Sequence, residues 1–404
     1  MVRFMVLLLA VVSASGFAQV TLEWLTGSLN DAEKARLETV LAGFREETGI
    51  TVRLNEVPVS ELPSRQSTMI LAGGRNDVMY GSVLWSNVFA ANDWMVDLTD
   101  RLGELDIPDW LAGSWDSVTY EGRVYGIPIR RDAFGLIYNK RMFQEAGVES
   151  CPITTEELLD VTKRLTHDGV YGIGIVGADH PQTVTQFISY LYMFNNPVFN
   201  EELTQSLINS PSGVAALQFY SDLVNVHGVA QPTAVTDTRA DVERLFYSER
   251  VAMILNGPWL PPTIAAQAPN LDWGVCLVPR PEGGEHWALG SGWDLGIAVT
   301  SPYPEETWEF IKYVVNPEHA NNMVSTFPAR RSALELDAFA SAAKEPWIES
   351  LLHMRAQPAT PVFSDAMLIF QESVNSALSG RRPAAEVANE MHQRIQALLD
   401  EFHR

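Results

Sequence analysis

The stretch VYGIPIRRDAFGLIYNKRMFQEAGV, residues 124–148, carries most of the information about the fold. Its two apolar runs predict two strands that are joined by a polar turn and followed by the start of a helix. The predicted turn holds three charged residues in a row, Arg130, Arg131 and Asp132. Charged side chains rarely lie between buried strands without a partner. We therefore expect these three to face a cleft between two lobes and to hold a polar ligand.

The chain on either side of this stretch alternates predicted strands and helices. Upstream, strands are expected at 20–26, 50–57 and 77–81, with helices at 30–49 and 60–73 between them. This strand–helix order implies a parallel sheet with right-handed crossover connections. Downstream, the pattern predicts a buried strand at 171–177 and helices at 154–169, 182–194, 211–227 and 303–316. The C-terminal third is expected to be mostly helical.

Length and composition indicate a globular α/β protein with two cores. The chain has 404 residues, which is long enough for two domains. Hydrophobic residues make up 46% of it and charged residues 19%, as in folded proteins rather than disordered ones. No long flexible linker separates the two predicted units. Two such lobes create a cleft, and ligands favour both interdomain clefts and the carboxyl ends of strands.

Charge and motifs together exclude several classes of function. The formal net charge of −22 disfavours nucleic acid and anionic lipid as partners. The eight His form neither an HExxH motif nor a close pair at ligand spacing, so we expect no metal site. No GxSxG elbow or Walker loop occurs, and GSGWDLG, residues 290–296, misses the dinucleotide-binding spacing. We expect no cofactor and interpret these glycines as permitting close backbone approach, with an ordinary turn as the alternative.

The first residues, MVRFMVLLLAVVSASGFAQV, have the pattern of a secretion signal. Arg3 supplies the positive end, and a short apolar run from Phe4 to Val12 precedes the small residues that a signal peptidase needs. We predict a signal peptide at 1–18 with cleavage after Ala18. The apolar run is too short for a retained membrane anchor. No Cys lies near the cleavage site, so we expect no lipid attachment there.

The two cysteines leave one question open. Cys151 precedes Pro152 in a predicted loop, and Cys276 lies in the strand-like run WGVCLVP. Export permits a disulfide, but only the spatial geometry of the two residues can establish one. A disulfide and two buried free thiols are therefore both open.

Four segments carry a resemblance to a known family. The opening stretch resembles a segment in which the chain crosses between lobes, and RVAMILNGPW (250–259) resembles a strand that ends in a ligand-facing Trp. GIAVTSPYPEETWEFIKYVVNPEHANNM (296–323) is similar to a later crossover strand and helix, and FPARRSAL (327–334) to a Pro-x-Arg segment. In this order the segments resemble extracellular solute-binding protein family 1. These are the sugar-type binding proteins of bacterial ABC importers, the maltose-binding protein among them. The similarity covers essentially all of 20–400.

The resemblance implies a fold and a function. The fold is a two-lobed periplasmic-binding-protein-like α/β fold of type II, with a ligand cleft between lobes that crossover strands join. The N-terminal lobe is expected at 19–131 plus 289–328, and the C-terminal lobe at 132–288 plus 329–404. Such a protein is not an enzyme. It is expected to act in the periplasm as a monomer, to capture a carbohydrate and to dock on the membrane permease of an ABC importer, whose partner subunit hydrolyses ATP.

The resemblance also marks candidate ligand-binding residues. Sugars present C–H faces and hydroxyl groups, which suit aromatic rings and carboxylates. The family's stacking Trp and crossover carboxylate match Trp259 and Asp132, and Ser28 lies beside a helix N-terminus whose N–H groups suit oxygens. The predicted ligand contacts are Ser28, Tyr80, Trp85, Arg131, Asp132, Trp259, Trp293, Asp294 and Arg330. The alternatives are core roles for the aromatic residues, an interlobe salt bridge for Asp132 and a surface role for Arg330.

Two departures from the maltose-binding pattern leave the ligand class open. Two Arg occupy positions where small or neutral residues are usual, and the region 177–196 lacks a clear family aromatic. The Arg pair makes an anionic solute the main alternative to a neutral carbohydrate: an acidic or phosphorylated sugar, or a glycerol phosphodiester. A secreted glycan-degrading enzyme is the second alternative, because the carboxylate pair of a glycosidase leaves no clear mark in a sequence.

Overall fold

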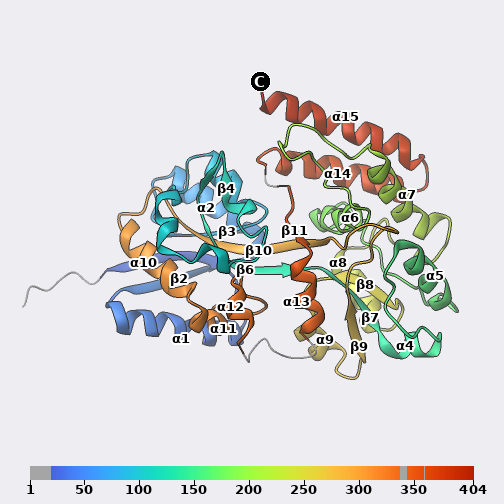
Figure 1. Ribbon diagram of the computed structural model, residues 1–404, viewed down its shortest axis with the longest axis horizontal. Coiled ribbons are helices and arrows are strands. Elements are labelled where there is room, and N and C mark those ends of the chain that lie inside the picture. Colours follow the sequence, from blue (N-terminus) through green and yellow to red (C-terminus); the bar gives the residue numbers. More distant parts are fainter. Residues whose placement is uncertain (1–19, 337–343, 359) are drawn as a thin grey trace, which may run out of the picture.

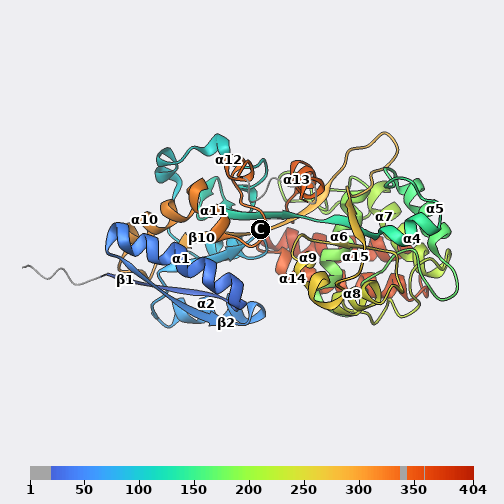
Figure 2. The same cartoon turned by 90° about the horizontal axis from the view of Figure 1, so that it is seen from below.

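The computed structural model of this chain describes residues 20–336, 344–358 and 360–404. The predicted signal peptide, residues 1–18, lies outside the described residues. Two α/β lobes lie side by side and are joined in the middle by two long strands (Figures 1 and 2). These strands are β6 (Ile127–Ala133) and β10 (Ala288–Ile297). The predicted α/β fold class is therefore confirmed.

The first lobe is built on a mixed sheet with the order β11-β10-β3-β1-β2, in which β6 pairs with β10. Its central strand β1 (Thr21–Gly27) runs parallel to β2 (Thr51–Val57) and β3 (Val78–Ser82), as the predicted strand–helix order requires. Strand β10 is antiparallel to β3 and β6, and parallel to β11 (Met354–Arg355). The small hairpin of this lobe comprises β4 (Thr119–Tyr120) and β5 (Arg123–Val124). Its helices are α1 (Asp31–Thr48), α2 (Leu62–Leu71), α3 (Ser86–Ala91), α10 (Pro304–Val314), α11 (Ala320–Met323) and α12 (Arg331–Leu334).

Helix α1 shows how the local sequence sets the start of the first lobe. Asn30 caps the helix in a reciprocal capping box with Glu33, and Gly49 ends it in a left-handed conformation. Leu37, Val40 and Phe44 lie on the buried face. The helix therefore begins immediately after the carboxyl end of β1, and its N-terminus points toward the site described below.

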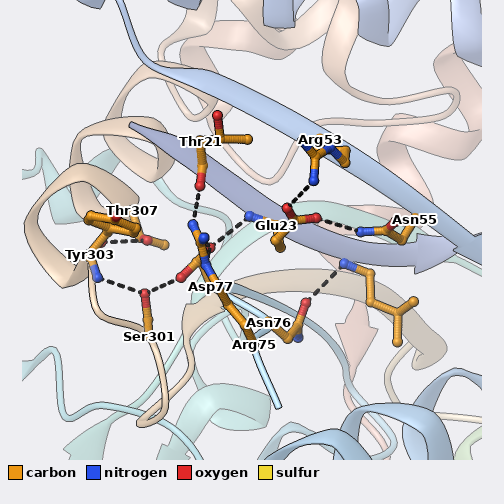
Figure 3. A network of polar contacts seen from close by, with 11 residues as sticks. Thr21, Glu23, Arg53, Asn55, Arg75, Asn76, Asp77, Ser301, Tyr303 and Thr307 are labelled. Carbon is orange, nitrogen blue, oxygen red and sulfur yellow. Dashed lines mark hydrogen bonds and ion pairs between the residues drawn. The ribbon is translucent and has the colours of Figure 1, made fainter. Parts of the chain in front are cut away.

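A polar network holds the opposite end of this sheet together (Figure 3). The buried carboxylate of Asp77, just before β3, accepts hydrogen bonds from the Glu23 backbone N–H at 2.7 Å, Arg75 Nε at 3.0 Å and Ser301 Oγ at 2.6 Å. The Arg75 guanidinium also lies over the Tyr303 ring, 4.8 Å from its centroid. The network joins β1, β3 and the loop before α10, and leaves the carboxyl ends of the parallel strands free for a site.

The second lobe surrounds a smaller antiparallel sheet with the order β8-β7-β9. Its strands are β7 (Gly135–Asn139), β8 (Met253–Asn256) and β9 (Trp273–Cys276). The helices are α4 (Lys140–Glu145), α5 (Thr155–Leu165), α6 (Pro181–Met193), α7 (Pro211–Asn225), α8 (Arg239–Tyr247), α9 (Leu260–Gln267), α13 (Glu345–Leu352), α14 (Phe363–Leu378) and α15 (Ala384–Phe402). Helix α13 packs where β6 and β10 enter this lobe, and α14 and α15 cover its outer side (Figure 1).

The predicted strand at 171–177 is wrong. The segment is buried, but it forms only isolated bridges, between Tyr171 and Val251 and between Ile173 and Ala230. Its backbone bonds are divided among separate partners. Tyr171 and Gly174 bond to backbone groups of residues 250–253, and Ile173 N donates to Val229 O. The Gln231 side-chain amide accepts from Ile175 N at 3.0 Å and donates to Ile175 O at 2.5 Å. The backbone groups of this segment therefore make their hydrogen bonds without forming a regular strand ladder. Apolar patterning alone does not reveal such an arrangement.

A disulfide between Cys151 and Cys276 joins the loop before α5 to strand β9. The two Cα atoms are 5.7 Å apart, within the usual range for a disulfide. The sequence left open a disulfide or two buried free thiols, and the structure contains the disulfide. The bond closes a loop of 125 residues within the second lobe.

The three charged residues of the opening stretch do not form a turn. They lie inside β6, which runs from Ile127 to Ala133 and pairs with β10, with a register shift between Trp293 and Asp294. The chain changes from the first sheet to the second at Phe134, between β6 and β7. We therefore place the first crossing between the lobes at Phe134, and the lobe ranges predicted from the sequence remain a proposal.

Candidate ligand-binding site

Strand β6 has two chemically different sides, because successive side chains of a strand point in opposite directions. Arg130, Asp132 and Phe134 alternate onto one side, which we call the ligand side. On it, Arg130 Nε donates to Asp132 Oδ2 at 2.8 Å. Arg131 points to the opposite side. The adjacent charges of the sequence thus belong to two separate environments.

Arg131 and Asp294 form a buried ion pair. Arg131 is 1% exposed, and its Nη2 lies 2.7 Å from Asp294 Oδ1. The same guanidinium donates to Ser117 Oγ at 3.0 Å and to the Ser114 carbonyl at 2.5 Å. Asp294 is 0% exposed, and its second oxygen accepts from Ser86 Oγ at 3.0 Å.

The burial of Arg131 and Asp294 favours a structural role for the pair, and their contact with a ligand stays a prediction. Both charges are neutralised by each other and by surrounding hydrogen bonds, and neither lines the cavity described below. Gly292 explains how the guanidinium fits, because a Cβ there would lie 2.6 Å from Arg131 Nη1 and 2.3 Å from the Arg130 carbonyl oxygen. The Gly-rich run thus permits a close backbone approach, as expected, but it lies inside strand β10 rather than in a turn, and it accommodates the ion pair.

Asp132 is the carboxylate at the centre of the ligand side. It is 0% exposed, and Arg130 satisfies one of its oxygens. The other, Oδ1, has no hydrogen-bond partner among the described residues. A buried carboxylate oxygen without a donor is costly, and a ligand hydroxyl can supply that donor.

Three aromatic residues of the first lobe gather beside Arg130. Tyr80, in β3, stacks on Trp293 of β10 with ring centroids 4.6 Å apart, and Trp85 meets Trp293 edge to face at 5.7 Å. The Arg130 guanidinium lies over the Trp293 ring, 5.9 Å from its centroid. Burial raises the pKa of Tyr80 to about 12, so its hydroxyl stays a neutral donor and acceptor at physiological pH. The structure thus brings the three predicted aromatic residues together.

A cavity of about 150 Å³ opens next to this cluster. It is lined by Ser28, which is exposed after β1, and by Tyr80, Arg130 and Trp293. Residues from the start of α1 and from α11 complete it: Glu33, Arg36, Leu37, Asn322 and Met323. The mixture of aromatic faces and hydrogen-bonding groups is typical of a polar organic ligand's site.

The second lobe contributes Trp259 and Phe134. Trp259 immediately precedes α9, and its indole meets Phe134 edge to face with centroids 5.4 Å apart. The indole lies directly over Gly257, where a Cβ would lie 2.1 Å from the ring atoms. The Asn256-Gly257-Pro258 turn is therefore required for this ring position. Trp259 and Phe134 form a second aromatic surface, at the other end of the ligand side of β6.

Arg330 lies elsewhere in the first lobe. Its Nε donates to Asp109 at 2.6 Å, its Nη1 to the Val315 carbonyl at 3.1 Å, and its guanidinium lies 4.7 Å from the Trp110 ring centroid. These contacts connect α12 to the loop around Trp110, and Arg330 does not line the cavity. These contacts favour a structural role for Arg330, and its contact with a ligand stays a prediction.

Two neighbours of the site were missed in the sequence analysis. Phe134 could have been found by extending the alternation of β6 two residues beyond Asp132. Arg239, the first residue of α8, lies over both Phe134 and Trp259. No motif marks it, because its position depends on how α8 packs against residues more than 100 positions away in the sequence.

A larger cavity of about 1500 Å³ lies between the lobes near the buried ion pair. Its wall from the first lobe includes Gly113 and Asp116, which flank the Ser114 carbonyl that Arg131 contacts. Its wall from the second lobe includes Trp287 and His353, and Arg355 of β11 also lines it. Burial raises the pKa of Asp116, although Arg131 and Arg355 act in the opposite direction. The cavity shares none of its lining residues with the smaller one.

These features define a class of protein. Two lobes joined by crossing strands, with aromatic surfaces from both lobes along one side of a crossing strand, form a solute-binding protein of the periplasmic type. The chain belongs to the bacterial extracellular solute-binding protein family, whose model matches residues 26–321. It is thus a non-enzymatic ABC transporter solute-binding protein.

Relatives and solved structures agree with this assignment. A solute-binding protein of Thermotoga lettingae, solved with α-D-tagatose, is 26% identical, with a TM-score of 0.81 over 94% of this chain and 100% of that one. Maltose-bound MalE3 of T. maritima is 25% identical, with a TM-score of 0.79 and the same coverage. The melibiose/raffinose/stachyose-binding protein MelE of Bacillus subtilis (strain 168) is 22% identical over 81% of this chain and 78% of its own length. No helix in the described part of this chain is both long and apolar enough to cross a membrane.

Proposed function

We propose that this protein is the exported binding component of an ABC importer that takes a carbohydrate between its two lobes and delivers it to the membrane permease. The observation that carries the proposal is the arrangement along β6: Asp132 stands between Arg130, which lies over Trp293, and Phe134, which meets Trp259 edge to face. Aromatic rings suit the C–H faces of a sugar, and a carboxylate oxygen accepts from its hydroxyls. The sugars named for the relatives above support the same class.

The sequence suggested an anionic ligand because two Arg stand next to each other. In the structure both of them are paired with carboxylates. Arg130 pairs with Asp132 and Arg131 with Asp294, so the two Arg bring no surplus positive charge. The family match gives no support to a glycan-degrading activity. The disulfide supports export, because disulfides persist in oxidising compartments.

A ligand screen by thermal shift tests the proposal. A ligand that binds the native state raises its stability by RT ln(1 + [L]/Kd). We expect a mono- or oligosaccharide in a broad panel to raise the melting temperature, with no product formed from it. Product that accumulates in proportion to the purified protein would contradict a binding role, and a panel with no stabilising sugar would contradict the ligand class.

Removing one aromatic ring from each lobe should weaken binding of the sugar that the screen identifies. Trp259→Ala and Trp293→Ala each remove a ring whose stacking area supports the ligand, and we expect a loss of about ten- to a hundred-fold, or about 1.4–2.8 kcal/mol. Trp110→Phe is the matched control, because Trp110 packs in the first lobe against Arg330 and outside the cavity. Titration calorimetry measures all three. If either Ala variant kept wild-type affinity, the lobe that carries the replaced Trp would not contribute to the binding site.

A further inference from the structure

Arg239 is a cation at the edge of the second aromatic surface. It begins α8 directly after the capping residue Thr238. Its guanidinium carbon lies 5.7 Å from the Phe134 ring centroid and 5.9 Å from that of Trp259. The side chain is half-buried. Stacking on two rings holds it in one place, at the end of the ligand side of β6 opposite to Arg130.

The described residues leave this guanidinium without an ion-pair partner. Its Nε is buried without a hydrogen-bond partner, and no carboxylate of the described residues lies within ion-pair distance of it. The nearest acid is Glu243, whose Oε1 accepts from Asn256 Nδ2 at 2.8 Å. Burial lowers the pKa of Arg239, and Glu243 only partly offsets this. Burial likewise raises the pKa of Glu243, which weakens it as a counter-ion.

Three other arginines described above differ from Arg239. Arg130, Arg131 and Arg330 each have a carboxylate within 2.8 Å. A half-buried cation that lacks one is costly unless something else supplies the negative charge. The flat guanidinium suits a planar oxyanion, which it can bind with two parallel N–H groups.

We propose that Arg239 binds a carboxylate carried by the sugar ligand, so that the solute is an acidic carbohydrate such as a hexuronate or a uronate-ended oligosaccharide. The inference rests on the proposed function and narrows its substrate class. Trp259 would face the pyranose ring of the acidic sugar, and Asp132 would accept from its hydroxyls. A carboxylate matches the single charge of Arg239, whereas a phosphate monoester carries about −1.5 to −2 at pH 7.

Titration calorimetry with matched probes tests the proposal. The probes are D-glucuronate, D-galacturonate and digalacturonate, with D-glucose, D-galactose and maltose as their neutral counterparts and D-glucose 6-phosphate as the phosphate arm. Each is titrated into the wild-type protein and into Arg239→Gln and Arg239→Lys. Arg244→Gln is the charge-matched control, because Arg244 lies on the same helix, is exposed and pairs with Asp241.

We expect an acidic probe to bind at least tenfold more tightly than its neutral counterpart. Arg239→Gln should weaken the acidic probe at least tenfold and the neutral one less than threefold, Arg239→Lys should retain part of the affinity, and Arg244→Gln should match the wild type. Neutral sugar or phosphate binding that exceeds uronate binding overturns the inference and leaves carbohydrate binding intact. Equal losses for acidic and neutral probes in Arg239→Gln overturn it as well. Absence of binding by every probe, together with an empty sugar screen, contradicts both proposals.

Discussion

Replacing Arg131 by Met should lower the free energy of unfolding by about 3–5 kcal/mol, because it leaves the Asp294 carboxylate buried without its cation. Asp294 is 0% exposed. Without Arg131, its carboxylate keeps the hydrogen bond from the Ser86 hydroxyl. Urea unfolding, followed by tryptophan fluorescence, measures the change from the midpoint and slope.

Two further variants isolate the ion pair as the cause. Arg131→Met combined with Asp294→Leu removes both charges together and should recover most of the loss, since apolar groups can replace a buried pair at little cost. Arg53→Met removes an exposed partner of Glu23, with 64% of the Arg53 side chain accessible, and should cost less than about 1 kcal/mol. A loss below about 1 kcal/mol in Arg131→Met would contradict the structural role given to this pair.

Removing the disulfide should cost a similar amount. The Cys151→Ser/Cys276→Ser variant frees a 125-residue loop in the unfolded chain. The chain-entropy model gives an upper value of about 5 kcal/mol for a loop of this size, and measured losses for native disulfides are about 2–5 kcal/mol. Unfolding of the wild type with and without a reducing agent, beside the double variant, measures the effect.

The reductant supplies the internal control for this experiment. Reduced wild type should unfold at the same urea concentration as the double variant, whose own midpoint should not respond to the reductant. A wild-type midpoint that is the same under both conditions would mean that the two cysteines are free thiols.

The sequence predicted the elements of the fold because its information is local. Strand alternation, the capping box at Asn30 and the left-handed Gly49 all act within a few residues. The parallel pairing of the first three strands followed from their order. The strand at 171–177 was predicted wrongly because its backbone bonds are divided between residues 250–253, Val229 and the Gln231 side chain, which lie at least 56 positions away.

The site was predictable only in part, because some of its contacts join residues far apart in the sequence. Trp259 and Asp132 lie in motifs that can be recognised in the sequence. A turn sets the position of Trp259 relative to Phe134, and the alternation of a strand sets that of Asp132. By contrast, the neutralising partners of Arg131 and Arg330 lie 163 and 221 positions away. Only the packing of the chain shows that these two cations are already paired, and that Arg239 is not.

The central claim is that the ligand side of β6 binds a carbohydrate through Asp132. Titration calorimetry of the sugar that the screen identifies, into the wild type and into Asp132→Ala, tests it most directly, with folding checked by circular dichroism. Charge-assisted hydrogen bonds of this kind contribute about 1.5–3 kcal/mol. The account predicts saturable binding to the wild type and a ten- to hundred-fold weaker affinity in the variant, at about 1.4 kcal/mol per decade. Wild-type affinity in a fully folded Asp132→Ala variant would contradict it and leave the carboxylate as an ordinary salt-bridge partner of Arg130.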